Sequence, residues 1–144
     1  MRLDANIKER IKNTFLETLN ITFIESDDPT SLEAIMPVTG QTAQTMGILH
    51  GGATISLAES LAGIGSNSVC AGDERCFGMQ ISASHISSAN VGDVVRAKGV
   101  IQHKGRSTHV WNINVFSDNT GRLVSSIRIT NAVVKQAVYS GKGK

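Results

Sequence analysis

The strongest restriction on the fold comes from the second half of the chain, where strand-length runs alternate with turn sequences. From Arg75 onward the runs are short and rich in β-branched residues. They are interrupted by Asn90-Val91-Gly92-Asp93, by Lys104-Gly105 and by Asp118-Asn119-Thr120-Gly121. Short turns of this kind favour antiparallel neighbours, so four strands are predicted near residues 76–88, 93–103, 106–117 and 122–135.

The third of these runs shows which face of the sheet is apolar. Trp111, Ile113 and Val115 alternate with Asn112 and Asn114. Successive side chains of a strand point to opposite faces, so one face is apolar and the other polar. An apolar sheet face has to be covered by another layer.

The segment that suits this cover runs from His50-Gly51-Gly52 to about Ser66 and consists largely of Ala, Leu, Ile and Ser. A buried helix is predicted there, with Leu57, Ala58, Leu61 and Ile64 as its core stripe. Ahead of it, an amphipathic helix is predicted on the row Leu3, Ile7, Ile11, Phe15 and Leu19, followed by two antiparallel strands at residues 21–25 and 32–36. The fold class is therefore α+β, one antiparallel sheet against a central helix.

Length and composition bound the kind of protein. The 144 residues, 40% of them hydrophobic, suit one domain, predicted over residues 1–138, with residues 139–144 as a flexible tail. A net charge of +2 and 4% aromatic residues argue against nucleic acid as a partner. With no apolar span or signal segment, and with Cys70 and Cys76 interpreted as reduced thiols, a cytoplasmic protein without membrane contact is expected.

Glu59 is the candidate catalytic residue. It is the one carboxylate between His50 and Gly72, and no Lys or Arg lies three or four residues away. Its helix face carries Ser56, Gly63 and Ser66, which allow another molecule to approach closely, whereas a solvent face normally carries long charged side chains. One interpretation is that Glu59 simply points to solvent; the other is that Glu59 acts as a general base or nucleophile.

The start of the same helix is a candidate oxyanion site. Backbone N–H groups near Gly51 lack helical partners and lie at the positive end of the helix dipole, whereas an ordinary loop-to-helix turn capped by His50 is the alternative. Nine residues separate His50 from Glu59, about 13.5 Å along one helix. If both belong to one site, Glu59 has to come from a second copy in a symmetric dimer.

These residues carry a family resemblance. Gln44-x-x-Gly47-Ile48-Leu49-His50-Gly51-Gly52-Ala53 followed by Leu57-Ala58-Glu59-Ser60 resembles hotdog-fold acyl-CoA thioesterases of the PaaI-like type, close to bacterial 1,4-dihydroxy-2-naphthoyl-CoA thioesterases. Gly78-Met79-Gln80-Ile81, Ser84-His85 and His109-Val110-Trp111 resemble them too. The resemblance extends over roughly residues 30–135.

The resemblance implies a hotdog fold and hydrolysis of a thioester, with an aromatic or medium-sized acyl-CoA as substrate. It places Gln44, His50 and Gly51 on one chain of a dimer or dimer of dimers and Glu59 on the other, with the Gly51 N–H polarising the carbonyl and Glu59 as nucleophile or base. Two departures are Gly63, where relatives often carry Ser or Thr, and Ser87, where some carry Arg.

Coenzyme A is expected as part of the substrate, and neither a cofactor nor a metal is implied. The basic turn Lys104-Gly105-Arg106-Ser107 is a candidate for its phosphates, with a solvated strand edge as the alternative, and His85 and Ser87 are further candidate contacts. His85, His103 and His109 lack the spacing of metal ligands. The rival functions are a non-catalytic acyl-CoA binding module, an acyl-CoA hydratase or dehydratase, and a structural dimer.

Overall fold

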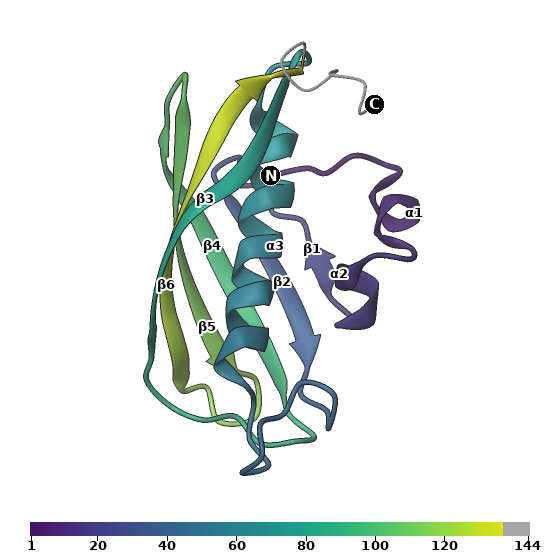
Figure 1. Ribbon diagram of the computed structural model, residues 1–144, viewed down its shortest axis with the longest axis vertical. Helices are drawn as coiled ribbons and strands as arrows, with labels where there is room; N and C mark the ends of the chain where they lie inside the picture. The colour runs from purple at the N-terminus through teal and green to yellow at the C-terminus, as the bar shows by residue number, and fades with distance from the viewer. Residues whose placement is uncertain (137–144) are drawn as a thin grey trace, which may run out of the picture.

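The structure is a computed structural model that describes residues 1–136. The predicted tail, residues 139–144, and the end of the predicted domain at residue 138 lie outside the described residues. Its core is a six-stranded antiparallel sheet with the strand order β1-β2-β4-β5-β6-β3 (Figure 1). The strands are β1 (Thr22–Ile24), β2 (Ser31–Pro37), β3 (Glu74–His85), β4 (Val94–Lys104), β5 (Thr108–Ser117) and β6 (Leu123–Lys135).

A single long helix, α3 (Gly51–Val69), lies along one face of this sheet (Figure 1). Leu57, Ala58 and Leu61 are fully buried against it, while Ile64, the fourth residue of the predicted stripe, is only partly buried. This arrangement confirms the predicted α+β hotdog architecture. The predicted helix end at Ser66 falls three residues short, because the helical pattern continues to Val69.

Strand β5 shows how the sheet sorts its side chains. Trp111, Ile113 and Val115 are fully buried beneath α3, as predicted from their alternation. Asn112 and Asn114 face a polar hollow on the opposite side of the sheet together with Ser82 and Ser84 of β3. The sheet therefore buries one face in the core and presents a polar outer face.

The N-terminal segment differs from the prediction of one helix. It forms two short helices, α1 (Ile7–Ile11) and α2 (Phe15–Thr18). The break falls at Asn13, whose φ of 59° is left-handed and incompatible with a continuing helix. Asparagine tolerates this conformation better than most residues, so one residue divides the apolar row.

The two edges of the sheet are unequal. One edge is β1, three residues long, and the other is β3, which spans twelve residues and pairs only with β6 among the described strands. Phe77 and Met79 are large apolar side chains exposed on β3. A long edge strand with exposed apolar side chains is a natural surface for pairing with another strand. No helix within residues 1–136 has the length and apolar character to cross a membrane.

Candidate active site

The start of α3 is held by a side-chain cap. His50 is the N-cap residue, and its Nδ1 accepts a hydrogen bond from the backbone N–H of Gly52 at 2.8 Å. Ala53 and Thr54 donate their backbone N–H groups to the carbonyl of His50. The Gly51 N–H has no acceptor within residues 1–136, so it is the N–H at this helix end that remains open to a ligand.

Glycine at position 51 is required by the neighbouring strand. A Cβ on Gly51 would stand 2.5 Å from Nε2 of His85, far inside van der Waals contact. His85 ends β3 and is fixed by a 2.7 Å hydrogen bond between its Nδ1 and Oγ of buried Ser125. The imidazole therefore packs directly on the first residue of α3.

A cavity of about 290 Å³ opens at this point. Its wall includes Gln44, Gly51, His85 and Ser87, four of the predicted site residues. Gln44 belongs to the loop before α3, where its side-chain oxygen accepts from the N–H of Met46 and its backbone pairs with Ile48. This leaves the NH₂ group of the Gln44 amide available to the cavity. His50 itself does not line it.

The predicted coenzyme A contacts do not come together within one chain. Ser87 lies at the cavity, although its hydroxyl already donates to the carbonyl of Leu123 at 2.6 Å. Lys104, Gly105 and Arg106 line a separate hollow beside Val69, at the other end of α3. That end is about 27 Å from Gly51 along the helix. Ser107 follows them, and its carbonyl accepts from the N–H of Val133.

Glu59 lies between these two ends and does not line either hollow. It is exposed on α3, and its Oε1 lies over Gly78 of β3, 2.9 Å from the point that a Cβ of residue 78 would occupy. It is eight residues beyond Gly51, about 12 Å along the helix. Glu59 thus faces the exposed β3 edge of the sheet and is not directed at the cavity of its own chain.

The polar surface predicted around Glu59 is correct only in part. Ser66 is not on it, because the hydroxyl of Ser66 is fully buried and accepts hydrogen bonds from Trp111 Nε1 at 2.8 Å and Asn131 Nδ2 at 2.9 Å. Sequence analysis missed Asn131 and Ser125, two buried polar residues of β6. Polar residues at inward positions of that strand were the available signal.

Two further groups have shifted pKa values. Burial raises the pKa of the Cys76 thiol to about 12, helped by nearby Cys70 and Glu74, and both cysteines are free. Burial, followed by the positive charge of Lys104, lowers the pKa of His109. The Cys76 thiol therefore does not have the environment of a nucleophile.

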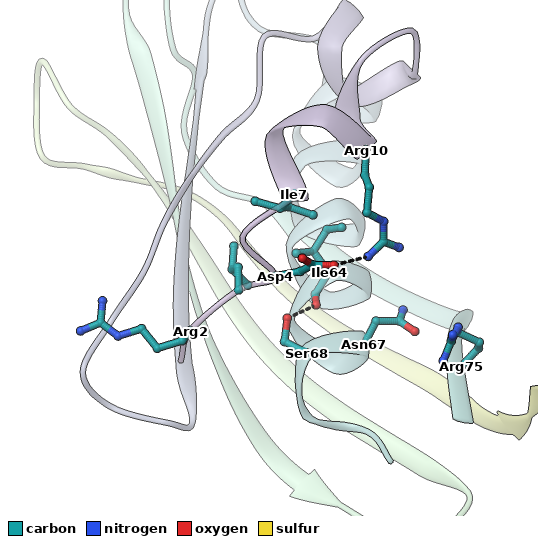
Figure 2. A pocket seen from close by; sticks show the side chains of 9 residues that line it. Arg2, Asp4, Ile7, Arg10, Ile64, Asn67, Ser68 and Arg75 are labelled. Atoms are coloured by element: carbon teal, nitrogen blue, oxygen red, sulfur yellow. Dashed lines mark hydrogen bonds and ion pairs between the residues drawn. The ribbon is translucent and has the colours of Figure 1, made fainter. Parts of the chain in front are cut away.

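A larger hollow of about 530 Å³ lies between the N-terminal segment and the last turns of α3 (Figure 2). None of the predicted site residues lines it. Its three arginines are occupied within the chain: Arg10 pairs with Asp4 at 3.4 Å, Arg2 pairs with Glu25 at 3.1 Å, and Arg75 donates to the backbone carbonyls of Gly72 and Glu74. The smaller cavity at Gly51 is therefore the better candidate, because it combines an open N–H with polar side chains.

Comparison with known proteins decides the family. The model of the thioesterase superfamily matches residues 46–124, which include Gly51, Glu59 and His85. The chain belongs to the thioesterase superfamily. The resemblance to hotdog thioesterases is thereby confirmed, and so is the expectation of a thioester hydrolase.

Individual relatives agree with this membership. This thioesterase is 41% identical to the 1,4-dihydroxy-2-naphthoyl-CoA hydrolase of Escherichia coli K12, over 81% of this chain and 83% of that protein. A crystallised variant of a thioesterase from Pseudomonas aeruginosa superposes with a TM-score of 0.85 at 36% identity, covering 90% and 92% of the two chains. The PaaI protein of E. coli, at 22% identity and a TM-score of 0.77 over 90% and 91% of the chains, shares the fold.

Proposed function

We propose that this thioesterase hydrolyses an acyl-CoA with an aromatic or medium-sized acyl group, in a site shared between two copies of the chain. The observation that carries the proposal is the open Gly51 N–H at the cavity, with Glu59 about 12 Å away on the same helix and directed at the sheet edge. One chain supplies an oxyanion donor without a carboxylate beside it. A second chain supplies the missing carboxylate.

Pairing through β3 supplies that carboxylate. A twofold axis across β3 makes two β3 strands antiparallel neighbours and extends the sheet through both chains. Gly78 beneath Glu59 and His85 beside Gly51 lie on this one strand. A twofold axis between these two positions places the Glu59 carboxylate of the partner copy near the start of α3.

The same symmetry accounts for the divided coenzyme A contacts. Glu74, at the N-terminal end of β3, lines the same hollow as Lys104 and Arg106, whereas His85 is at the C-terminal end of β3. Antiparallel pairing places the N-terminal end of one strand beside the C-terminal end of the other. The basic turn of one chain then approaches the cavity of its partner, where its charges can bind phosphates.

In the proposed reaction the thioester carbonyl accepts a hydrogen bond from the Gly51 N–H, which stabilises the negative charge that develops on its oxygen. Gln44 orients the thioester or water through its side-chain amide, and His50 caps the helix start that presents the Gly51 N–H. Glu59 acts as base toward water or as nucleophile, and the C–S bond breaks to release the coenzyme A thiol and the acid. The chemistry uses protein groups and water, with no cofactor or metal in the proposal.

Thiol release from benzoyl-CoA, a naphthoyl-type CoA and fatty acyl-CoAs tests this function. We expect release with wild type and a fall in kcat on the order of 10²–10⁴ for Glu59→Ala. Glu33→Ala, at a carboxylate paired with Arg96 on another part of the sheet, is the matched control and should keep its activity. Near wild-type rates for Glu59→Ala would contradict the assignment; binding without thiol release would favour an acyl-CoA binding module.

A further inference from the structure

A buried oxygen near Glu59 lacks a hydrogen-bond donor. Asn131 of β6 is 1% exposed, and its Nδ2 donates to the carbonyl of Ala62 at 3.0 Å and to Oγ of Ser66. The Ala62 carbonyl can only accept, so the amide cannot be rotated to exchange its nitrogen and oxygen. Within residues 1–136, Asn131 Oδ1 is the one buried side-chain oxygen or nitrogen with no hydrogen-bond partner.

This oxygen is directed toward the space over Gly78. Gly78 and Asn131 are paired across β3 and β6, so both present the same face of the sheet to α3. The point that a Cβ of residue 78 would occupy is 3.7 Å from Asn131 Oδ1 and 2.9 Å from Glu59 Oε1. Two acceptor oxygens from different elements therefore converge where glycine has no side chain.

Two acceptors facing one small space call for a molecule that donates twice. Water does so, and a buried acceptor is costly unless it receives a donor. A carboxylate and an amide oxygen also match the needs of a hydrolytic water: one accepts its proton and the other fixes its orientation.

We propose that Asn131 Oδ1 and the Glu59 carboxylate together hold the water that attacks the thioester, which makes Asn131 a positioning residue. The inference rests on the proposed function and deepens it by favouring Glu59 as base. The water oxygen forms a bond to the carbonyl carbon, and its proton goes to Glu59. When the C–S bond breaks, the thiolate takes this proton from Glu59 and leaves as coenzyme A, so the Glu59 carboxylate is restored.

The primary test is kcat and KM for Asn131→Ala. We expect kcat to fall about tenfold to a hundredfold while KM changes by less than about twofold, since the water and not the substrate loses a contact. Ser66→Ala is the matched control, because it disturbs the same buried network but leaves Asn131 bonded to Ala62. An equal loss of kcat in both variants would overturn the proposal by assigning the effect to packing.

Gly78→Ala provides a second route that leaves the Asn131 hydrogen bonds intact. Its methyl group would narrow the space between Glu59 and Asn131 in which the water is proposed, and the atom it meets first is the flexible end of Glu59, so the chain should fold. We expect a fall in kcat similar to that of Asn131→Ala. Wild-type kcat in Gly78→Ala would contradict the inference even if Asn131→Ala failed to fold.

A double variant separates this inference from the proposed function. If Asn131 acts through the water that Glu59 activates, Asn131→Ala should have little further effect on the residual rate of Glu59→Ala. A full additional loss in that background would overturn the shared-water role. If Glu59→Ala abolishes turnover but Asn131→Ala does not change it, only this inference fails; if Glu59→Ala is fully active, the proposed function fails first.

Discussion

Nε2 of His85 lies 2.5 Å from the point where a Cβ of Gly51 would stand, so the last residue of β3 rests on the first residue of α3. This contact ties the exposed edge strand to the helix end that carries the open N–H. It also explains a sequence requirement that the turn alone does not impose, because Gly51 does not have a positive φ.

The first prediction follows from that contact. Gly51→Ala keeps the backbone N–H but forces the His85 ring away from α3 and strains its hydrogen bond to Ser125. We expect kcat for thiol release to fall on the order of 10²-fold or more, because the proposed oxyanion donor, the Gly51 N–H, is displaced together with the His85 ring that packs on it. Gly72→Ala, whose Cβ would meet nothing within 4 Å, is the control. Unchanged kcat in Gly51→Ala would show that the site lies elsewhere.

The second prediction concerns the basic turn. Within residues 1–136 the side chains of Lys104 and Arg106 form no hydrogen bond or ion pair, so their charges remain available to phosphates. Lys104→Ala with Arg106→Ala should raise KM for acyl-CoA about tenfold with little change in kcat, which corresponds to a charge-assisted contact. A thioester of N-acetylcysteamine, which lacks the nucleotide, should show no such change, and neither should Arg128→Ala on the outer sheet face. Equal changes in KM for both substrates would contradict a role of this turn in binding the coenzyme A phosphates.

The third prediction tests the pairing of β3. An axis between Gly78 and His85 brings the two copies of Ser82 close to one another on the outer face of the sheet. Ser82→Cys should therefore form a disulfide-linked dimer under mild oxidation, seen on a non-reducing gel. Ser126→Cys presents a thiol on the same face but one strand further in, on β6, and should remain uncrosslinked. The reverse pattern would contradict pairing through β3.

The fourth prediction uses the pKa of His109, which burial lowers. In the unfolded chain a histidine has a pKa near 6.5, whereas His109 in the folded chain has a lower pKa. Below about pH 6.5 the unfolded state therefore binds more protons, and the free energy of unfolding decreases as the pH falls toward the folded-state pKa of His109. We expect Tm to decrease from pH 7.5 to pH 5.5 and this decrease to be smaller in His109→Gln. Exposed His103→Gln should keep the wild-type dependence. A pH dependence that His109→Gln leaves unaltered would assign it to other groups.

The sheet and α3 could be predicted because their signals are local. Alternation around Trp111 and the uncharged stretch around Leu57 each lie within one element, and turn sequences bracket the strands. The N-terminal helix was predicted wrongly because its local signal, a regular apolar row, suggests one continuous helix. The left-handed backbone of Asn13 interrupts that helix, and the apolar row does not reveal it.

The site was harder to predict because its contacts join residues far apart in the chain. Glu59 and Gly51 became candidates because of their local surroundings, but the packing of His85 on Gly51 joins two elements. The sequence placed Lys104 with His85 as contacts for one ligand, whereas β4–β5 geometry sets the turn at the opposite end of α3. Asn131 was not predicted because its proposed role depends on Gly78 and Glu59, which belong to other elements.

The central claim, a thioester site built from two chains, is tested most directly by mixing inactive variants. Glu59→Ala and Gly51→Ala, each inactive alone, are unfolded together and refolded at equal concentrations. Random pairing makes half of the dimers mixed, each with one intact site, so the account predicts recovery of about one quarter of wild-type thiol release. Two wild-type controls, refolded alone and with Glu59→Ala, set the scale. No recovery, although the mixed dimers are shown to form, would mean that Gly51 and Glu59 act within one chain and would contradict the account.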